Sequence, residues 1–464
     1  MNFSENYENL KKLMEVNFEK KSLSHKINKK ASLVPFKIEN TFPEFEKGFY
    51  NIFGEFSRIL LDKKMVKELS IDDMIQEIYS GDMIIDDSDK EYLTTLLDEY
   101  VFNEKNELKL SHPYLYLYIP LSNNKHKAGE KELALFLRDI FCFDNEKLVD
   151  FFNSKKSNQV LIKLILKYVP PLDDSKPEDK DYPKRKYYPK LDYVTQLFEK
   201  DIAFAMENKK FLDNMDNIFA FYYFFYISQL ILKLSRGANY DDDVEKVYYL
   251  LDWEDPHPDR DAVKSYDFLK KVCHATYPRT SLLSQLNTLL GTEYYLEKEL
   301  LVFFNELPLE SRKNFLYYLK RWIIDYATVR NFDEVPLIDD MPDDYEELVK
   351  KLYGYLNDEK KGVSYKSKNF YNQNFEEFAK KYFLKRRGSY GYVLNMNRDM
   401  LQMLTALCVR DKKIKINQLF IEYEKRGIFF DVNSKKKIKI FLNNLNLIDK
   451  KSDGGDAEYV RPVL

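Results

Sequence analysis

The sequence predicts a mainly α-helical protein of several domains, with a helical body and a C-terminal winged-helix module of three short helices plus a β-hairpin. Glycine and proline number only 13 and 16 in 464 residues, so long stretches lack helix breakers. Hydrophobic residues make up 44% and charged residues 32%, proportions that are typical of a folded, soluble chain. At about 150 residues per domain, the length corresponds to roughly two to four domains.

The first predicted domain is helical and covers residues 1–169. Its clearest apolar stripe recurs at steps of three or four residues, which is the spacing of one helix face. The stripe consists of Phe45, Phe49, Phe53 and Phe56. The next segment, 170–190, holds five of the 16 prolines among charged residues, so it predicts a linker.

A second helical domain is predicted over 191–331, and it contains the most apolar run of the chain. The run IFAFYYFFYISQLILKL begins at Ile218 and is interrupted by Ser228 and Gln229. Its uninterrupted apolar part is shorter than the ~20 residues that a membrane-spanning helix needs. We therefore expect a buried helix and no membrane partner. Residues 332–397 then supply an acidic loop and connecting helices.

The winged-helix module is predicted from three apolar repeats that precede a hairpin signal. The repeats are Leu401, Leu404 and Cys408; Ile416, Leu419, Phe420 and Tyr423; and Ile438, Phe441, Leu442 and Leu445. Gly427 is placed to end the second helix, and Ser434 or Asn433 is placed to cap the third. Two strand-like runs flank SDGGD, which places Gly454 and Gly455 in the turn of the wing.

Basic residues concentrate in this module, residues 398–464, which holds 14 Lys and Arg against 9 Asp and Glu although the whole chain has a net charge of -3. Lysine and asparagine on the exposed face of a third helix suit contact with phosphates and base edges. The candidate DNA-binding residues are Lys435, Lys436, Lys437, Lys439, Asn443, Lys450, Lys451 and Arg461. The wing tip carries Asp453, Asp456 and Glu458, which we expect to turn away from phosphate. Winged helices also dock proteins, so DNA contact and protein docking both remain open.

Motifs for catalysis and for cofactor binding are missing, so we expect a non-catalytic protein without cofactor or metal. Neither phosphate-loop pattern, GxxxxGK(S/T) or GxGxxG, occurs, and RRGSYGY from Arg386 indicates a basic, exposed turn. Cys142, Cys273 and Cys408 lie far apart, which is typical of a reducing compartment and provides no paired zinc ligands. The first residues also lack the apolar core of a signal peptide, so we expect a cytoplasmic protein.

A metal-dependent nuclease is one alternative, because such enzymes place carboxylate ligands beside a lysine that steadies developing charge. Glu107 and Lys109 have this spacing within strand-compatible flanks, and Asp98 lies upstream. The same spacing recurs at Glu178 and at Glu359. In a sequence with so many charged residues, three such matches are expected by chance. The nuclease therefore ranks below the non-catalytic interpretation.

The end of the chain resembles a known family over residues 404–464. The segments EKRGIFFD and SDGGDAEYVR resemble the C-terminal end of the DptG family, also called DndG, of DNA phosphorothioation-dependent restriction proteins. The resemblance implies a subunit of a bacterial defence complex that damages DNA lacking a sulfur mark on its backbone. It also implies two ATPase subunits and double-stranded DNA as partners, and it supplies no catalytic residues.

A kleisin-like or other adaptor subunit of an ATP-driven anti-plasmid complex is a further alternative. In such a complex a terminal winged helix docks on a partner ATPase. Co-purification with a coiled-coil ATPase would favour this alternative, whereas co-purification with the two restriction ATPases would favour the restriction complex.

Overall fold

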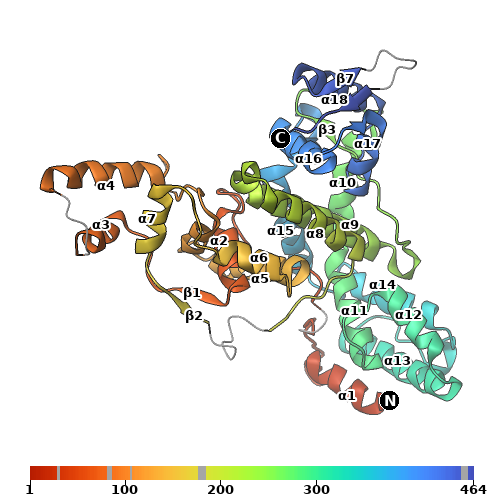
Figure 1. The fold of residues 1–464 in the computed structure, drawn as a ribbon. Helices are drawn as coiled ribbons and strands as arrows, with labels where there is room; N and C mark the ends of the chain where they lie inside the picture. Colours follow the sequence, from red (N-terminus) through yellow and green to blue (C-terminus); the bar gives the residue numbers. More distant parts are fainter. Residues whose placement is uncertain (29–31, 81–85, 105–106, 176–183, 451–457, 464) are drawn as a thin grey trace.

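The chain folds as a mainly helical protein, as the sequence predicts, with small β-sheets between the helices (Figure 1). The computed structural model describes residues 1–464 except 29–31, 81–85, 105–106, 176–183, 451–457 and 464. Buried apolar side chains form one large cluster that extends from Phe3 to Val460. Both ends of the chain therefore contribute to the same core.

The central element of this core is α9 (Met215–Ser235), which lies in the middle of the molecule (Figure 1). By length and composition α9 could cross a membrane, but 94% of its most apolar window is buried inside the protein. Aromatic side chains from three other helices surround it, with ring centroids 4.7 to 5.1 Å apart. These pairs are Phe53–Phe219, Phe198–Phe219 and Phe378–Tyr223. The prediction of a buried helix is confirmed.

Even the two polar side chains that interrupt the apolar run of α9 are buried and bonded. Gln229 is fully buried, and its amide exchanges hydrogen bonds of 2.7 and 3.0 Å with the backbone of Glu245. Ser228 donates to the carbonyl oxygen of Phe225 one turn earlier. A buried polar group costs little only when it is paired in this way. The interior of the protein, rather than a lipid phase, thus accommodates the run.

The N-terminal half wraps α9 on one side and extends an arm away from it. Helix α2 packs on α5, and α3, α4 and α7 form the arm at the left of Figure 1. The helices are α1 (Phe3–Leu13), α2 (Tyr50–Leu60), α3 (Ile71–Ser80), α4 (Asp87–Val101), α5 (Lys127–Leu137), α6 (Glu146–Asn153) and α7 (Val160–Tyr168). Helix α1 leaves this half and packs against α11 and α13 in the lower part of the molecule.

The predicted linker at 170–190 is attached to the N-terminal half at both described ends. Strand β2 (Leu172–Asp174) pairs antiparallel with β1 (Lys63–Met65). Further along, the backbone amides of Lys186 and Tyr187 donate to the buried carboxylate of Asp139 at 2.7 and 3.0 Å. Residues 176–183 lie outside the described residues.

The helices after this segment build the rest of the body. They are α8 (Asp192–Glu207), α10 (Asp261–His274), α11 (Thr276–Leu290), α12 (Glu297–Glu306), α13 (Leu309–Val329), α14 (Tyr345–Asn357) and α15 (Tyr365–Tyr382). A three-stranded sheet joins them to the C-terminal module, in the order β3 (Leu250–Leu251), β5 (Tyr392–Met396), β4 (Leu384–Arg386). Strand β3 is parallel to β5 although more than 130 residues separate them, and sequence reasoning missed this sheet.

Among its described residues, the C-terminal module has three helices and a three-stranded antiparallel sheet. The helices are α16 (Arg398–Val409), α17 (Ile416–Lys425) and α18 (Val432–Asn444). The sheet has the order β6 (Ile414–Lys415), β8 (Glu458–Val460), β7 (Ile448–Lys450), so the hairpin strands gain a third strand that was not predicted. The wing turn with Gly454 and Gly455 lies outside the described residues.

Two details of the third helix differ from the prediction. Helix α18 is capped by Asp431, whose side chain accepts from the backbone amide of Ser434 at 2.8 Å, and neither Ser434 nor Asn433 is the cap. The helix starts earlier than predicted because Asp431 is the first of three capping-type residues in DVNS. Leu445 lies just past the helix end and is 39% exposed, so it does not complete the apolar stripe.

A buried ion pair fastens the module to the body. The carboxylate of Asp201 in α8 accepts from the Nε and Nη2 of Arg426 at 2.9 and 2.8 Å, and both side chains are almost completely buried. The same carboxylate accepts from Arg410 at 2.9 Å and from the hydroxyl of Tyr222 in α9 at 2.5 Å. Next to Arg426, Gly427 has a φ of +72° and fits so closely against Phe225 that a Cβ would come within 2.5 Å of its ring.

We predict that Asp201→Asn destabilises the protein by about 3–5 kcal/mol, because it removes the fully buried counter-charge of Arg426 and leaves that guanidinium only the partly exposed carboxylate of Glu422, at 3.2 Å. The control is Lys425→Gln on α17, which breaks the exposed pair with Glu422 and should cost less than about 1 kcal/mol. Chemical denaturation of both variants checks the difference. Equal midpoints for the two variants would show that the buried pair does not fasten the module.

Candidate nucleic-acid interface

The outer face of α18 is the exposed surface on which the candidate DNA-binding residues converge. Ile438 and Leu442 are fully buried against the module core, and the opposite side of the helix presents Lys436 and Asn443 to solvent. Val432 and Ile440 share this side and are 69% and 61% exposed. We define the outer face of α18 as Val432, Lys436, Ile440 and Asn443, with Lys437 at its edge. This face combines positive charge, an amide and two apolar side chains.

Two of the four lysines of α18 that were predicted to bind DNA form ion pairs within the module. The ammonium of Lys435 lies 2.9 Å from Glu424 of α17, and that of Lys439 lies 2.5 Å from Glu458 of β8. Lys436 and Lys437 have no ion-pair partner among the described residues. The free positive charge of the helix therefore resides on these two side chains.

Of the hairpin residues predicted to contact DNA, the structure describes the side chain of Arg461 alone. Arg461 pairs with Asp449 at 3.0 Å, so its charge is compensated. Glu458 lies in β8 at the base of the hairpin and turns back to Lys439, which corrects the expectation that it belongs to an acidic tip. The backbone of Lys450 pairs with Glu458 in the sheet. Lys451, Asp453 and Asp456 lie outside the described residues.

The body of the protein holds the N-terminal end of α18, a contact that sequence reasoning missed. The guanidinium of Arg260 donates to both carboxylate oxygens of Asp431 at 2.6 and 2.9 Å. The buried carboxylate of Glu254 accepts from Arg260 at 3.1 Å and from the hydroxyl of Ser434 at 2.7 Å. We call Glu254, Arg260, Asp431 and Ser434 the docking network. Burial raises the pKa of Asp431, but the hydrogen bonds from Arg260 and Ser434 outweigh it and lower the pKa overall.

An aromatic contact extends this attachment along the same side of α18. The indole of Trp253 lies 5.1 Å from the ring of Phe441, and the guanidinium of Arg398 lies over the same indole at 5.3 Å. These distances are within the range of favourable aromatic and cation–π contacts. The docking network and Trp253 therefore cover one flank and the first turn of the helix, while its outer face stays open.

Glu107 and Lys109, the pair proposed for a nuclease, have partners within the protein. Glu107 lies 3.2 Å from the ammonium of Lys47, and the ammonium of Lys109 donates to the carbonyl oxygen of Glu99. Within the part of the chain that the structure describes, no group of three or more His, Cys, Asp or Glu side chains is placed to hold a metal ion. The structure thus gives Glu107 and Lys109 partners other than a metal cluster.

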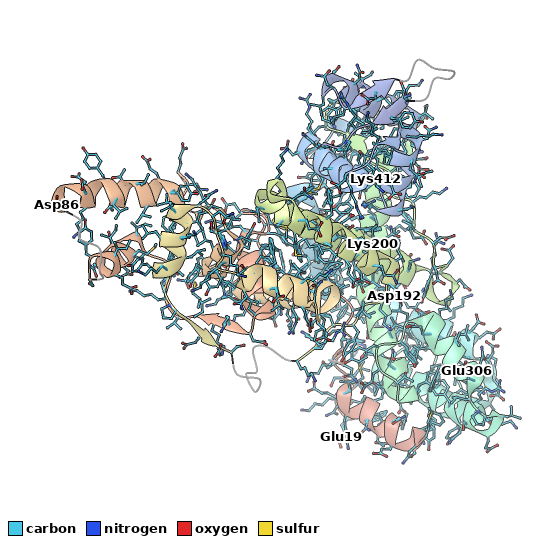
Figure 2. The ribbon with its side chains drawn as sticks, viewed as in Figure 1. Glu19, Asp86, Asp192, Lys200, Glu306 and Lys412 are labelled. Atoms are coloured by element: carbon cyan, nitrogen blue, oxygen red, sulfur yellow. The ribbon has the colours of Figure 1, made fainter. Side chains whose placement is uncertain are left out.

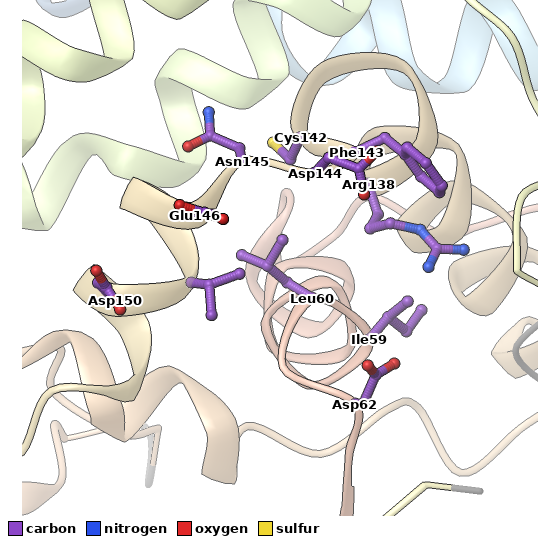
Figure 3. A pocket seen from close by; sticks show the side chains of 11 residues that line it. Ile59, Leu60, Asp62, Arg138, Cys142, Phe143, Asp144, Asn145, Glu146 and Asp150 are labelled. Atoms are coloured by element: carbon purple, nitrogen blue, oxygen red, sulfur yellow. The ribbon is translucent and has the colours of Figure 1, made fainter. Parts of the chain in front are cut away.

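A cavity of about 330 Å³ lies between the end of α2, the π-helical turn Arg138–Cys142 and the start of α6 (Figure 3). It is lined by several carboxylates and by Arg138. Burial raises the pKa of the Cys142 thiol well above its ordinary value, so this thiol is a poor nucleophile and metal ligand.

The basic turn RRGSYGY connects β4 to β5 and is exposed at its tip. Gly388 and Gly391 have φ angles of +55° and +68°, and a Cβ on either would meet open space. Arg387, by contrast, turns inward and donates to Asn395 at 2.8 Å and to the carbonyl oxygen of Leu251 at 3.0 Å. Its role is to fasten the sheet, which leaves Arg386 as the exposed cation of the turn.

Neither protein-family models nor curated proteins give a match to this sequence.

We predict that Arg260→Met loosens the first turn of α18, because it removes two charge-assisted hydrogen bonds from Asp431. Bonds to charged groups contribute about 1.5–3 kcal/mol each, so amide hydrogen exchange at residues 435–437 should accelerate at least about tenfold. Lys435→Met is the matched control, since it breaks a half-exposed pair on the same helix and should change the exchange less. Unchanged exchange in Arg260→Met would mean that the docking network does not hold the helix.

Proposed function

We propose that this protein is a non-catalytic, cytoplasmic subunit of a bacterial phosphorothioation-dependent DNA restriction complex, and that its C-terminal winged helix contacts double-stranded DNA through the outer face of α18. The resemblance of residues 404–464 to the DptG family supports the system and its two ATPase partners. The order helix, strand, helix, helix, strand, strand, with β8 between β6 and β7, supports a winged helix.

The observation that carries the DNA contact is the free charge on the outer face of α18. Lys436 and Lys437 are adjacent, and no carboxylate among the described residues neutralises either of them. Asn443 lies two turns further along the same face, where an amide can bond to a base edge. Ile440, between them, offers an apolar contact of the kind that thymine methyl groups accept.

Protein docking is the second candidate function of the same face, and the exposed apolar residues favour it. Val432 and Ile440 are 69% and 61% exposed, and such side chains stabilise a contact with another protein more than a contact with phosphates. This candidate corresponds to an adaptor subunit, kleisin-like or otherwise, that docks on a partner ATPase.

We expect Lys436→Glu with Lys437→Glu to weaken binding to a DNA duplex and to reduce its salt dependence. Each lost phosphate contact lowers the slope of log affinity against log salt by about 0.9, so two contacts correspond to a change of about 2. Fluorescence anisotropy of a labelled duplex at several salt concentrations measures both quantities. Lys350→Glu with Lys351→Glu, an adjacent exposed pair on α14, is the matched control and should bind as the unmodified protein does.

Ile440→Asp separates the two candidates. If α18 binds DNA, this variant adds a negative charge at the interface and weakens duplex binding together with the lysine variant. If α18 docks a protein, Ile440→Asp releases the partner ATPases in co-purification, whereas duplex affinity is the same in all variants. Equal duplex affinity and an unchanged salt slope in the lysine variant would refute the proposed DNA face.

A further inference from the structure

The arm of the N-terminal half ends in a helix that has one unpartnered face. Helix α4 packs on α3 (Figure 1). Its Leu97 and Val101 are fully buried. The opposite side of α4 points away from the protein and exposes Tyr92 by 79% and Leu96 by 50%. These two residues are one helical turn apart, so they form a single apolar pair on the surface. Asp86 marks the free end of the arm in Figure 2.

Carboxylates surround this apolar pair without compensation. Asp89, Glu91, Asp98 and Glu99 are exposed, and none of them has an ion-pair partner among the described residues. The one lysine of the helix, Lys90, lies on the inner side with its ammonium 4.9 Å from the centre of the Tyr79 ring. We call Tyr92, Leu96 and the four carboxylates the outer face of α4. It is apolar at its centre and negative at its rim.

The outer face of α18 has the complementary composition. Its apolar residues, Val432 and Ile440, adjoin the free ammonium groups of Lys436 and Lys437. In both faces the apolar side chains are exposed on a helix and the nearby charges are unpaired, but the signs are opposite. The two helices lie at different ends of the molecule, so one chain cannot bring its own faces together (Figure 1).

From this complementarity we infer that the outer face of α4 binds the outer face of α18 on a second copy of the chain. A nucleic acid would be repelled by the carboxylates of α4, and a second α4 would be repelled by their equal charge. The contact joins two different faces, so copies either close into a ring, the smallest being a reciprocal dimer, or continue as an open chain.

The contact is expected to be weak and dependent on salt. One helix face buries less than the ~800 Å² per partner of a standard stable interface. Its charges are exposed, so they are screened when the Debye length falls to about 3 Å near 1 M salt. Because the outer face of α18 is shared, DNA and a second copy exclude one another. The self-association itself does not depend on the proposed DNA contact.

The test measures the average mass of the purified full-length protein by light scattering as concentration rises at low salt. We expect the mass to exceed that of a monomer and to return to it at high salt. Asp98→Lys with Glu99→Lys should keep the protein monomeric, and so should Lys436→Glu with Lys437→Glu. Asp339→Lys with Asp340→Lys, which reverses two adjacent exposed carboxylates elsewhere, should associate as the unmodified protein does.

Mixing the two monomeric variants gives the decisive result. The α4 variant retains the outer face of α18, and the α18 variant retains the outer face of α4. The mixture should therefore associate although neither variant does alone. A mixture that stays monomeric, or an unmodified protein that is monomeric at every concentration, would overturn the inference. Duplex binding separates it from the proposed function, because the α4 variant should lose self-association and bind DNA at least as tightly as the unmodified protein does.

Discussion

The arrangement of this protein depends on one buried carboxylate, that of Asp201. A charge in the interior is tolerated only with a counter-charge and with its hydrogen-bonding capacity filled, and here two arginines and a tyrosine supply both. Arg426 and Arg410 come from the C-terminal module, whereas Asp201 and Tyr222 come from the body. Their directional bonds therefore fix the orientation of the module. The face of α18 that is open to solvent is a consequence of this constraint.

The sequence predicts the helical body well where a pattern is local, and poorly where partners are remote. An apolar run that covers every side of a helix has to be buried, which is why the interior position of α9 could be foreseen. Which helices would surround it could not, because Phe53, Phe198 and Phe378 are spread over more than 300 residues. The two-residue strands β3 and β6 were missed for the same reason, since pairing with distant strands defines them.

The candidate site shows the same division between local and remote information. Helical periodicity places Lys436 and Asn443 opposite the buried stripe, and both are exposed in the structure. Periodicity contains no information on which lysines are neutralised, because Glu424 and Glu458 come from another helix and from a strand. The docking network could not be predicted from the sequence either, since 171 residues separate Arg260 from Asp431.

The small number of free charges limits what the module can do alone. Nonspecific affinity for DNA grows with the number of phosphates that a protein neutralises, which is about six to ten in proteins whose affinity falls steeply with rising salt. Among the described residues of α18 only Lys436 and Lys437 are uncompensated, so one copy of this helix supplies a small part of that number. Firm binding then requires further contacts on the same DNA from partner subunits or from additional copies. A chain with so few free charges on α18 and a second exposed helix face on a separate arm fits the role of a subunit better than that of an independent DNA-binding protein.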